Sequence, residues 1–128
     1  METPLQKVLI VEDEAPILNG IADKFTFEGF MAIKARDGNE GLKQALEQHP
    51  DLILLDYRMP NADGLTLLEK LREDAWGKNA RVIMWSNSHS AGTVDRAIRL
   101  GVLDFLIKSD WEYKDVVKKA RVAINSNL

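Results

Sequence analysis

The chain has 128 residues, no cysteine and a formal net charge of −3, from 17 lysines and arginines against 20 acidic residues. This length predicts a single domain over residues 1–128 with a hydrophobic core of its own. The missing cysteines exclude disulfides, thiolate zinc sites and a thiol nucleophile. The charge balance argues against direct, charge-driven binding of nucleic acid. No apolar run approaches the roughly 18 residues of a membrane span, and acids directly behind the first apolar run argue against a signal peptide.

Five short apolar runs predict five strands. They cover residues 7–11, 30–33, 51–55, 82–85 and 102–107. The first, third and fourth runs are nearly continuous in apolar residues, which is typical of strands that are covered on both faces, as in a parallel sheet.

A helical pattern follows each predicted strand. In the first such segment Ile17, Ile21 and Phe25 recur every four residues, with Pro16 suited to the first helical turn and Gly29 to the end. The other four segments carry apolar stripes of the same kind, formed by Leu42, Ala45 and Leu46, by Leu65, Leu68 and Leu71, by Val94, Ala97 and Ile98, and by Val116, Val117, Ala120 and Ile124.

This alternation of strands and helices predicts an α/β fold with five βα units. Strands that alternate with helices imply right-handed crossovers, and these place helices on both faces of one parallel sheet. We expect a flavodoxin-like, doubly wound, five-stranded sheet with strand order 2-1-3-4-5. In that order the first and third strands are neighbours where the direction of winding reverses, which is where such sheets bind ligands.

Polar side chains come directly behind four of the predicted strands. Glu12 and Asp13 follow the first, Asp56 the third, Ser86 the fourth and Lys108 the fifth. Three carboxylates at one sheet edge repel one another unless a cation joins them. Hard oxygen ligands suit Mg²⁺, which also binds phosphate oxygens. The set therefore predicts a metal-assisted phosphoryl site with a carboxylate as candidate nucleophile.

Each of these signals alone also has a simpler interpretation. The acids before Pro16 suit a helix N-terminus, a lysine at a strand end is commonly a solvated surface group, and a serine there is commonly a turn residue. Asp56 is harder to explain in this way, because it directly follows a buried run. The four features together at one sheet edge favour a functional site.

Four motifs carry a resemblance to a known family. They are VLIVEDE at residues 8–14, DLILLDYRMP at 51–60 with Asp63-Gly64 behind it, VIMWS at 82–86 and DFLIK at 104–108. In this order and at these strand ends, the chain resembles a response-regulator receiver domain of two-component signalling over essentially its whole length.

The resemblance implies a role for each site residue. Asp56 is the expected phosphoacceptor, which attacks a phosphohistidine or a small phosphodonor to give an acyl phosphate. Asp13 and Asp56 are expected to contact Mg²⁺ (or Mn²⁺) directly, Glu12 through water, and the backbone carbonyl of Arg58 as a further ligand. Lys108 is expected to pair with the phosphoryl oxygens.

The resemblance also implies a conformational switch. The hydroxyl of Ser86 is expected to move to the phosphoryl group while Phe105 turns inward. The signal would leave through the face formed by the fourth helix, the fifth strand and the fifth helix. Candidate residues of this face are Val94, Ile98, Trp111 and Tyr113. For each of them taken singly, ordinary packing in the core or at its rim is the favoured interpretation.

The implied function is that of a cytoplasmic regulatory domain and not of an enzyme, beyond its own phosphorylation and dephosphorylation. Its partners would be a histidine kinase or histidine phosphotransfer protein and a downstream protein target. One alternative is a degenerate receiver that binds partners without phosphorylation. Another is a Mg²⁺-dependent aspartyl phosphatase, which Arg58 disfavours because such enzymes carry a second acid at this position. The sequence leaves open whether the receiver stands alone or belongs to a longer regulator.

Several residues depart from the usual family pattern. Ser109 replaces the proline that commonly follows the lysine, so we expect a trans Lys108-Ser109 peptide bond. Asn87 replaces a small residue behind Ser86. We hypothesise that Asn87 and Arg58 tune the lifetime of the phosphoryl group, and that Trp85 reports Mg²⁺ binding by its fluorescence.

Overall fold

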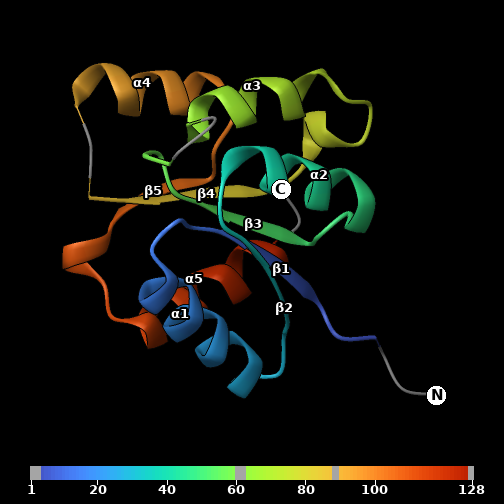
Figure 1. The fold of residues 1–128 in the computed structure, drawn as a ribbon, viewed down its shortest axis with the longest axis vertical. Coiled ribbons are helices and arrows are strands. Elements are labelled where there is room, and N and C mark those ends of the chain that lie inside the picture. The colour runs from blue at the N-terminus through green and yellow to red at the C-terminus, as the bar shows by residue number, and fades with distance from the viewer. Residues whose placement is uncertain (1–3, 60–62, 88–89, 127–128) are drawn as a thin grey trace.

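A computed structural model describes residues 4–59, 63–87 and 90–126 (Figure 1); Pro60, at the end of the 51–60 motif, lies outside them. The strands are β1 (Lys7–Val11), β2 (Met31–Ala35), β3 (Leu52–Leu55), β4 (Val82–Ser86) and β5 (Asp104–Ile107). The α-helices are α1 (Ala15–Phe27), α2 (Gly38–Gln48), α3 (Gly64–Glu73), α4 (Ala91–Arg99) and α5 (Tyr113–Ile124). Two 3-10 turns are η1 (Gly77–Asn79) and η2 (Lys108–Asp110).

The five strands form one parallel sheet in the order β2-β1-β3-β4-β5, as the sequence predicts. Figure 1 shows α1 and α5 on one face of the sheet and α2, α3 and α4 on the other. The flavodoxin-like, doubly wound fold is therefore confirmed. Within the described ranges, none of the helices is long and apolar enough to cross a membrane.

Three strands begin later than the runs predict: β3 by one residue, Asp51, and β2 and β5 after an apolar residue. Phe30 precedes β2, because its backbone N–H donates to the carbonyl of Phe25 at 3.0 Å and its ring packs edge-on against that of Phe25, 5.4 Å between centroids. Val102 precedes β5, because its N–H donates to the carbonyl of Ala97 at the end of α4. At Phe30 and at Val102 the hydrogen bond to the preceding helix keeps the apolar residue in a turn, and the residue therefore does not join the sheet.

The first helix begins and ends where the sequence indicates. Pro16 lies in its first turn, where the missing N–H of proline costs no helical hydrogen bond. Gly29 follows the helix with φ of +93°, a conformation that favours glycine because it has no Cβ.

The core consists of two layers, one on each face of the sheet. One layer joins α1 and α5 to the sheet, and the other joins α2, α3 and α4 to it. Most of the predicted stripe residues are buried, but Leu46 and Ile98 are 37% and 62% exposed. The prediction that Ile98 packs inward is wrong, because α4 buries Ala97 alone among its residues and presents its neighbour outward.

The strand register places the ends of the strands side by side. Val11 pairs with Leu55, and Leu55 pairs with Met84. The next residue of each strand, Glu12, Asp56 and Trp85, therefore falls in one row at the carboxyl edge of the sheet. Alternation along the strands directs this row to the face covered by α1 and α5.

Gly64 permits a close approach of α3 to this edge. A Cβ at Gly64 would lie 2.3 Å from the backbone oxygen of Asp56. At Gly92 in α4, by contrast, an added Cβ would meet the Oγ of Ser90 at 4.0 Å, an ordinary contact distance.

We predict that Gly64→Ala lowers the free energy of unfolding by about 1–3 kcal/mol, because the added methyl group displaces the Asp56 backbone. The matched variant Gly92→Ala is expected to keep or raise stability, since alanine favours a helix over glycine. Urea denaturation of both variants provides the measurement. Equal unfolding midpoints for the two variants would contradict this explanation.

Candidate functional site

Three carboxylates gather at the carboxyl edge of the sheet. Glu12 and Asp13 follow β1, Asp56 follows β3, and one oxygen of each lies within 4.8 Å of the others. Glu12 and Asp56 are buried, at 3% and 6% exposure, and Asp13 is half-buried. The structure thus brings together the acids that the sequence singles out, in an arrangement that suits a divalent cation.

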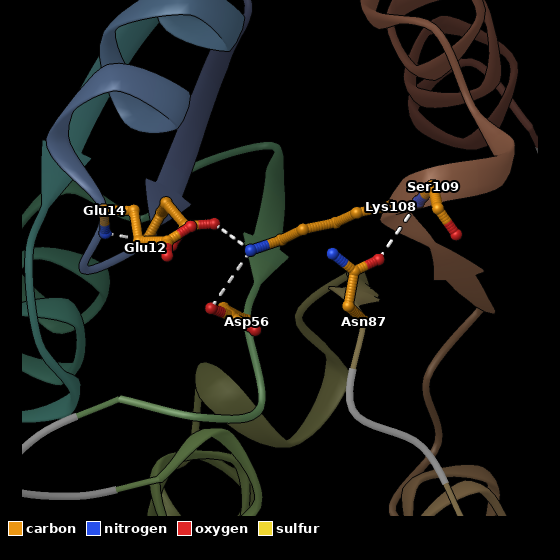
Figure 2. A network of polar contacts seen from close by, with 6 residues as sticks. All are labelled: Glu12, Glu14, Asp56, Asn87, Lys108 and Ser109. Carbon is orange, nitrogen blue, oxygen red and sulfur yellow. Dashed lines mark hydrogen bonds and ion pairs between the residues drawn. The ribbon is translucent and has the colours of Figure 1, made fainter.

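Lys108 reaches this cluster from the far side of β4. Its Nζ forms an ion pair with Oε1 of Glu12 and another with Oδ2 of Asp56 at 3.2 Å (Figure 2). Only 10% of the lysine side chain is exposed. The interpretation of Lys108 as a solvated surface group is therefore wrong, because the tertiary fold supplies two carboxylate partners.

Burial and charge shift the protonation of this group of residues. Burial raises the pKa of the Glu12 carboxyl to about 7, and the nearby charge of Asp56 acts in the same direction, against the hydrogen bond from Lys108. Burial alone would lower the pKa of the Lys108 ammonium, but its contacts with Glu12 and Asp56 outweigh burial and raise that pKa.

Glu12 also holds the start of α1. Its Oε2 accepts a hydrogen bond from the backbone N–H of Glu14 at 3.1 Å (Figure 2). Glu14 occupies the N-cap position, where its own side chain makes no capping bond to the described residues. Helix capping and site formation are therefore not alternatives here, since one carboxylate has an oxygen in each role.

Ser86 and Phe105 lie on neighbouring strands. Ser86 is the last residue of β4, not the first behind it, and is 1% exposed. Phe105 pairs with Met84 in the β4–β5 register and packs, half-buried, against the layer of α2, α3 and α4. Arg58, two residues behind Asp56, is exposed.

The structure joins two residues that the sequence singles out separately. Asn87 Oδ1 accepts a hydrogen bond from the backbone N–H of Ser109 at 3.0 Å (Figure 2). No cis peptide bond occurs in 4–59, 63–87 or 90–126, so the predicted trans bond between Lys108 and Ser109 is confirmed. Sequence reasoning missed the Asn87–Ser109 contact, because no pattern in the chain pairs residues of two different loops.

Trp85 lies beside Asp56 in the strand register and is 3% exposed. Its ring stands 5.8 Å from that of Tyr113 at the start of α5. The indole Nε1 is buried and has no hydrogen-bond partner among the described residues. The hypothesis that Trp85 reports Mg²⁺ binding by its fluorescence stays a prediction.

The four candidate residues of the predicted outer face differ in their exposure. Ile98 is exposed and Val94 half-buried on α4. Trp111 and Tyr113 pack against the layer of α1 and α5, and a Cβ at Gly20 in α1 would lie 2.8 Å from the Tyr113 ring. For the two aromatic residues the packing interpretation is therefore confirmed.

The geometry and the comparisons with known proteins agree. The sequence profile of the response regulator receiver domain matches residues 8–120. The chain belongs to this family. A solved CheY-like response regulator receiver domain protein from Methanospirillum hungatei JF-1 has the same fold, with a TM-score of 0.89 at 24% identity over 95% of each chain.

Curated relatives contain this domain within longer chains. Protein-glutamate methylesterase/protein-glutamine glutaminase 1 of Syntrophomonas wolfei is 31% identical over 97% of this chain and 38% of that protein. The phosphate regulon transcriptional regulatory protein PhoB of Klebsiella pneumoniae is 31% identical over 80% of this chain and 45% of that protein. This receiver domain thus spans less than half the length of either relative.

The raised pKa of Glu12 predicts a specific pH dependence of stability in the metal-free protein. Because the folded-state pKa of about 7 lies above the ordinary value of 4.5, the folded protein binds the proton more tightly than the unfolded chain. The stabilisation is complete below the ordinary value and is lost as the pH rises through 7. Relative to Glu12→Gln, the receiver is expected to lose up to about 1.4 kcal/mol per pH unit in this window.

Urea denaturation of both proteins between pH 4.5 and 8, in the presence of a chelator, provides the measurement. A difference in unfolding free energy that stays constant across this range would contradict the raised pKa.

Proposed function

We propose that this receiver domain is a phosphorylatable switch of a two-component or phosphorelay system, which takes its phosphoryl group on Asp56. The observation that carries the proposal is the cluster of Glu12, Asp13 and Asp56 with Lys108 directed into it. Phosphoryl transfer needs a nucleophilic carboxylate, a binding site for a cation and a second positive charge near the phosphoryl oxygens.

The three carboxylates fit Mg²⁺, or Mn²⁺ in its place, because both prefer oxygen ligands. In the proposed arrangement Asp13 and Asp56 bind the cation directly, Glu12 binds it through water, and the backbone carbonyl of Arg58 completes the protein ligands. The bound cation would neutralise negative charge on the phosphoryl oxygens during transfer.

The protein residues then perform the transfer. An oxygen of Asp56 forms a bond to phosphorus, in line with the bond from phosphorus to the donor nitrogen, which breaks and leaves its electron pair on that nitrogen. Lys108 leaves its place between the carboxylates and pairs with the phosphoryl oxygens. Ser86 donates its hydroxyl to the same group, and Phe105 turns inward as the β4–α4 connection follows Ser86.

The proposed partners are a histidine kinase or histidine phosphotransfer protein in the cytoplasm, and a protein target on the α4–β5–α5 face. The exposed side chain of Ile98 is the described apolar group of α4 that is best placed for such a contact. In this proposal the domain, over residues 1–128, is regulatory, and any output is performed by a partner or a linked domain. Arg58 and Asn87 are proposed to tune the phosphoryl lifetime.

A degenerate receiver that works without phosphorylation is disfavoured, because the residues expected to act in phosphoryl transfer are all present, namely Glu12, Asp13, Asp56, Ser86 and Lys108. An aspartyl phosphatase is disfavoured as well, because Arg58 occupies the position at which such enzymes carry a second acid.

Asp56→Asn tests the phosphoacceptor. We expect the receiver to gain one phosphoryl group when it is incubated with Mg²⁺ and phosphoramidate, and Asp56→Asn to gain none, because an amide is not a nucleophile for this transfer. Intact mass spectrometry provides the measurement. Asp110→Asn, an exposed aspartate on η2, is the control and is expected to behave like the parent. A folded parent that binds Mg²⁺ but gains no phosphoryl group would instead support the degenerate receiver.

Lys108→Met tests the competition between the ammonium and the cation. Without the buried positive charge we expect Mg²⁺ to bind roughly tenfold more tightly or better, while phosphorylation becomes slower. Calorimetric titration measures the binding. Lys118→Met removes an exposed lysine of α5 and is expected to change neither quantity. Weaker Mg²⁺ binding in Lys108→Met would refute the competition.

A further inference from the structure

A hydrogen bond between Asn87 and Ser109 connects the two loops that carry the right-hand part of the site in Figure 2. Asn87 directly follows Ser86, and Ser109 directly follows Lys108. The Oδ1 of Asn87 accepts the backbone N–H of Ser109 at 3.0 Å. The backbone of Lys108 is thereby joined to the chain that leaves β4.

The bond continues the pairing of β4 and β5 beyond the sheet. The register of these strands ends with Ser86 opposite Ile107. One step further along both chains, the Asn87 side chain takes the place that a strand carbonyl would have in the ladder. The N–H of Ser109 is available for this purpose because residue 109 is not proline, which has no N–H.

The position of the Lys108 ammonium depends on where the Lys108 backbone lies, because the side chain must extend from β5 to the carboxylates that follow β1 and β3. β5 is separated from β3 by β4, and from β1 by β4 and β3. With neighbouring strands about 4.8 Å apart, these separations are about 10 and 14 Å. Figure 2 shows the lysine stem stretched across this gap toward Glu12 and Asp56. An extended stem cannot compensate for a backbone that moves away.

We infer that the Asn87–Ser109 hydrogen bond is a positioning latch, which holds the Lys108 ammonium between the carboxylates of Glu12 and Asp56. Through Lys108 the latch sets the affinity of the site for Mg²⁺ and also the rate of phosphorylation. The effect on the rate of phosphorylation rests on the proposed function. Asn87 and Ser109 are positioning residues, and what Ser109 contributes is its backbone N–H.

Opening the latch has opposite effects on the two quantities. A displaced ammonium competes less with Mg²⁺ for the same carboxylates, so the metal binds more tightly. The same displaced ammonium is less ready to meet the incoming phosphoryl oxygens, so phosphorylation becomes slower. General disruption of the site would weaken metal binding and slow phosphorylation together, so the opposite signs identify positioning.

The test is a double-mutant cycle. Asn87→Ala removes the acceptor and Ser109→Pro removes the donor, while Ser109→Ala keeps the N–H and serves as control. Calorimetry measures the affinity for Mg²⁺, and intact mass follows phosphorylation by phosphoramidate. Each of the first two variants is expected to bind Mg²⁺ about 2- to 10-fold more tightly and to react more slowly by a similar factor. The double variant is expected to change no further than the larger single change, and Ser109→Ala to match the parent.

Independent, additive effects of Asn87→Ala and Ser109→Pro would overturn the latch, as would an Asn87→Ala variant with unchanged Mg²⁺ affinity. Asn87→Ala decides the question alone if Ser109→Pro fails to fold, since Asn87 is exposed. A parent that takes no phosphoryl group, with Mg²⁺ affinities that follow the cycle, refutes the proposed function and keeps the latch. A parent that is phosphorylated, with an additive cycle, refutes the latch and keeps the proposed function.

Discussion

The burial of two carboxylates beside one ammonium is the constraint on which the rest of the site depends. Glu12 and Asp56 are taken out of water at the same sheet edge, where the charge of Asp56 disfavours the ionised form of Glu12. Lys108 offsets this repulsion with one buried positive charge. Burial, more than the charge of Asp56, raises the pKa of Glu12, and a divalent cation at this edge would favour the ionised carboxylate.

The parallel order of the strands explains why this arrangement involves every part of the domain. The carboxylates come from β1 and β3 at the centre of the sheet, and the lysine comes from β5 at its edge. In the proposed function, a new charge at the centre would be met by a side chain that is anchored two or three strands away. Trp85 and Ser86, adjacent on β4, direct their side chains to opposite faces of the sheet. The site consequently contacts both core layers, and a change of charge there can bias helices on either side.

Much of the fold could be predicted because the apolar periodicity records it directly. The continuous run at residues 7–11 is the whole of β1, and Pro16 and Gly29 mark the first helix as expected. Periodicity fails where the arrangement of neighbouring elements decides whether and by what an apolar side chain is covered. Phe30 belongs by pattern to β2 but packs on Phe25, and Ile98 continues the stripe of α4 but lies in solvent. Local pattern cannot resolve such cases, because the choice depends on which neighbour the fold brings close.

The sequence by itself determined the class of the fold, the order of its elements and the acids at the strand ends, because strand period, helix period and the place of a polar residue behind a buried run are all local properties. Only the tertiary structure decided how these residues meet. It turned Lys108 from a strand-end lysine into a buried partner of two carboxylates, gave Glu12 a second role at the start of α1, and joined Asn87 to Ser109. These contacts link residues up to 96 positions apart, and their existence depends on strand order and register, which bring together at one edge what the chain keeps apart.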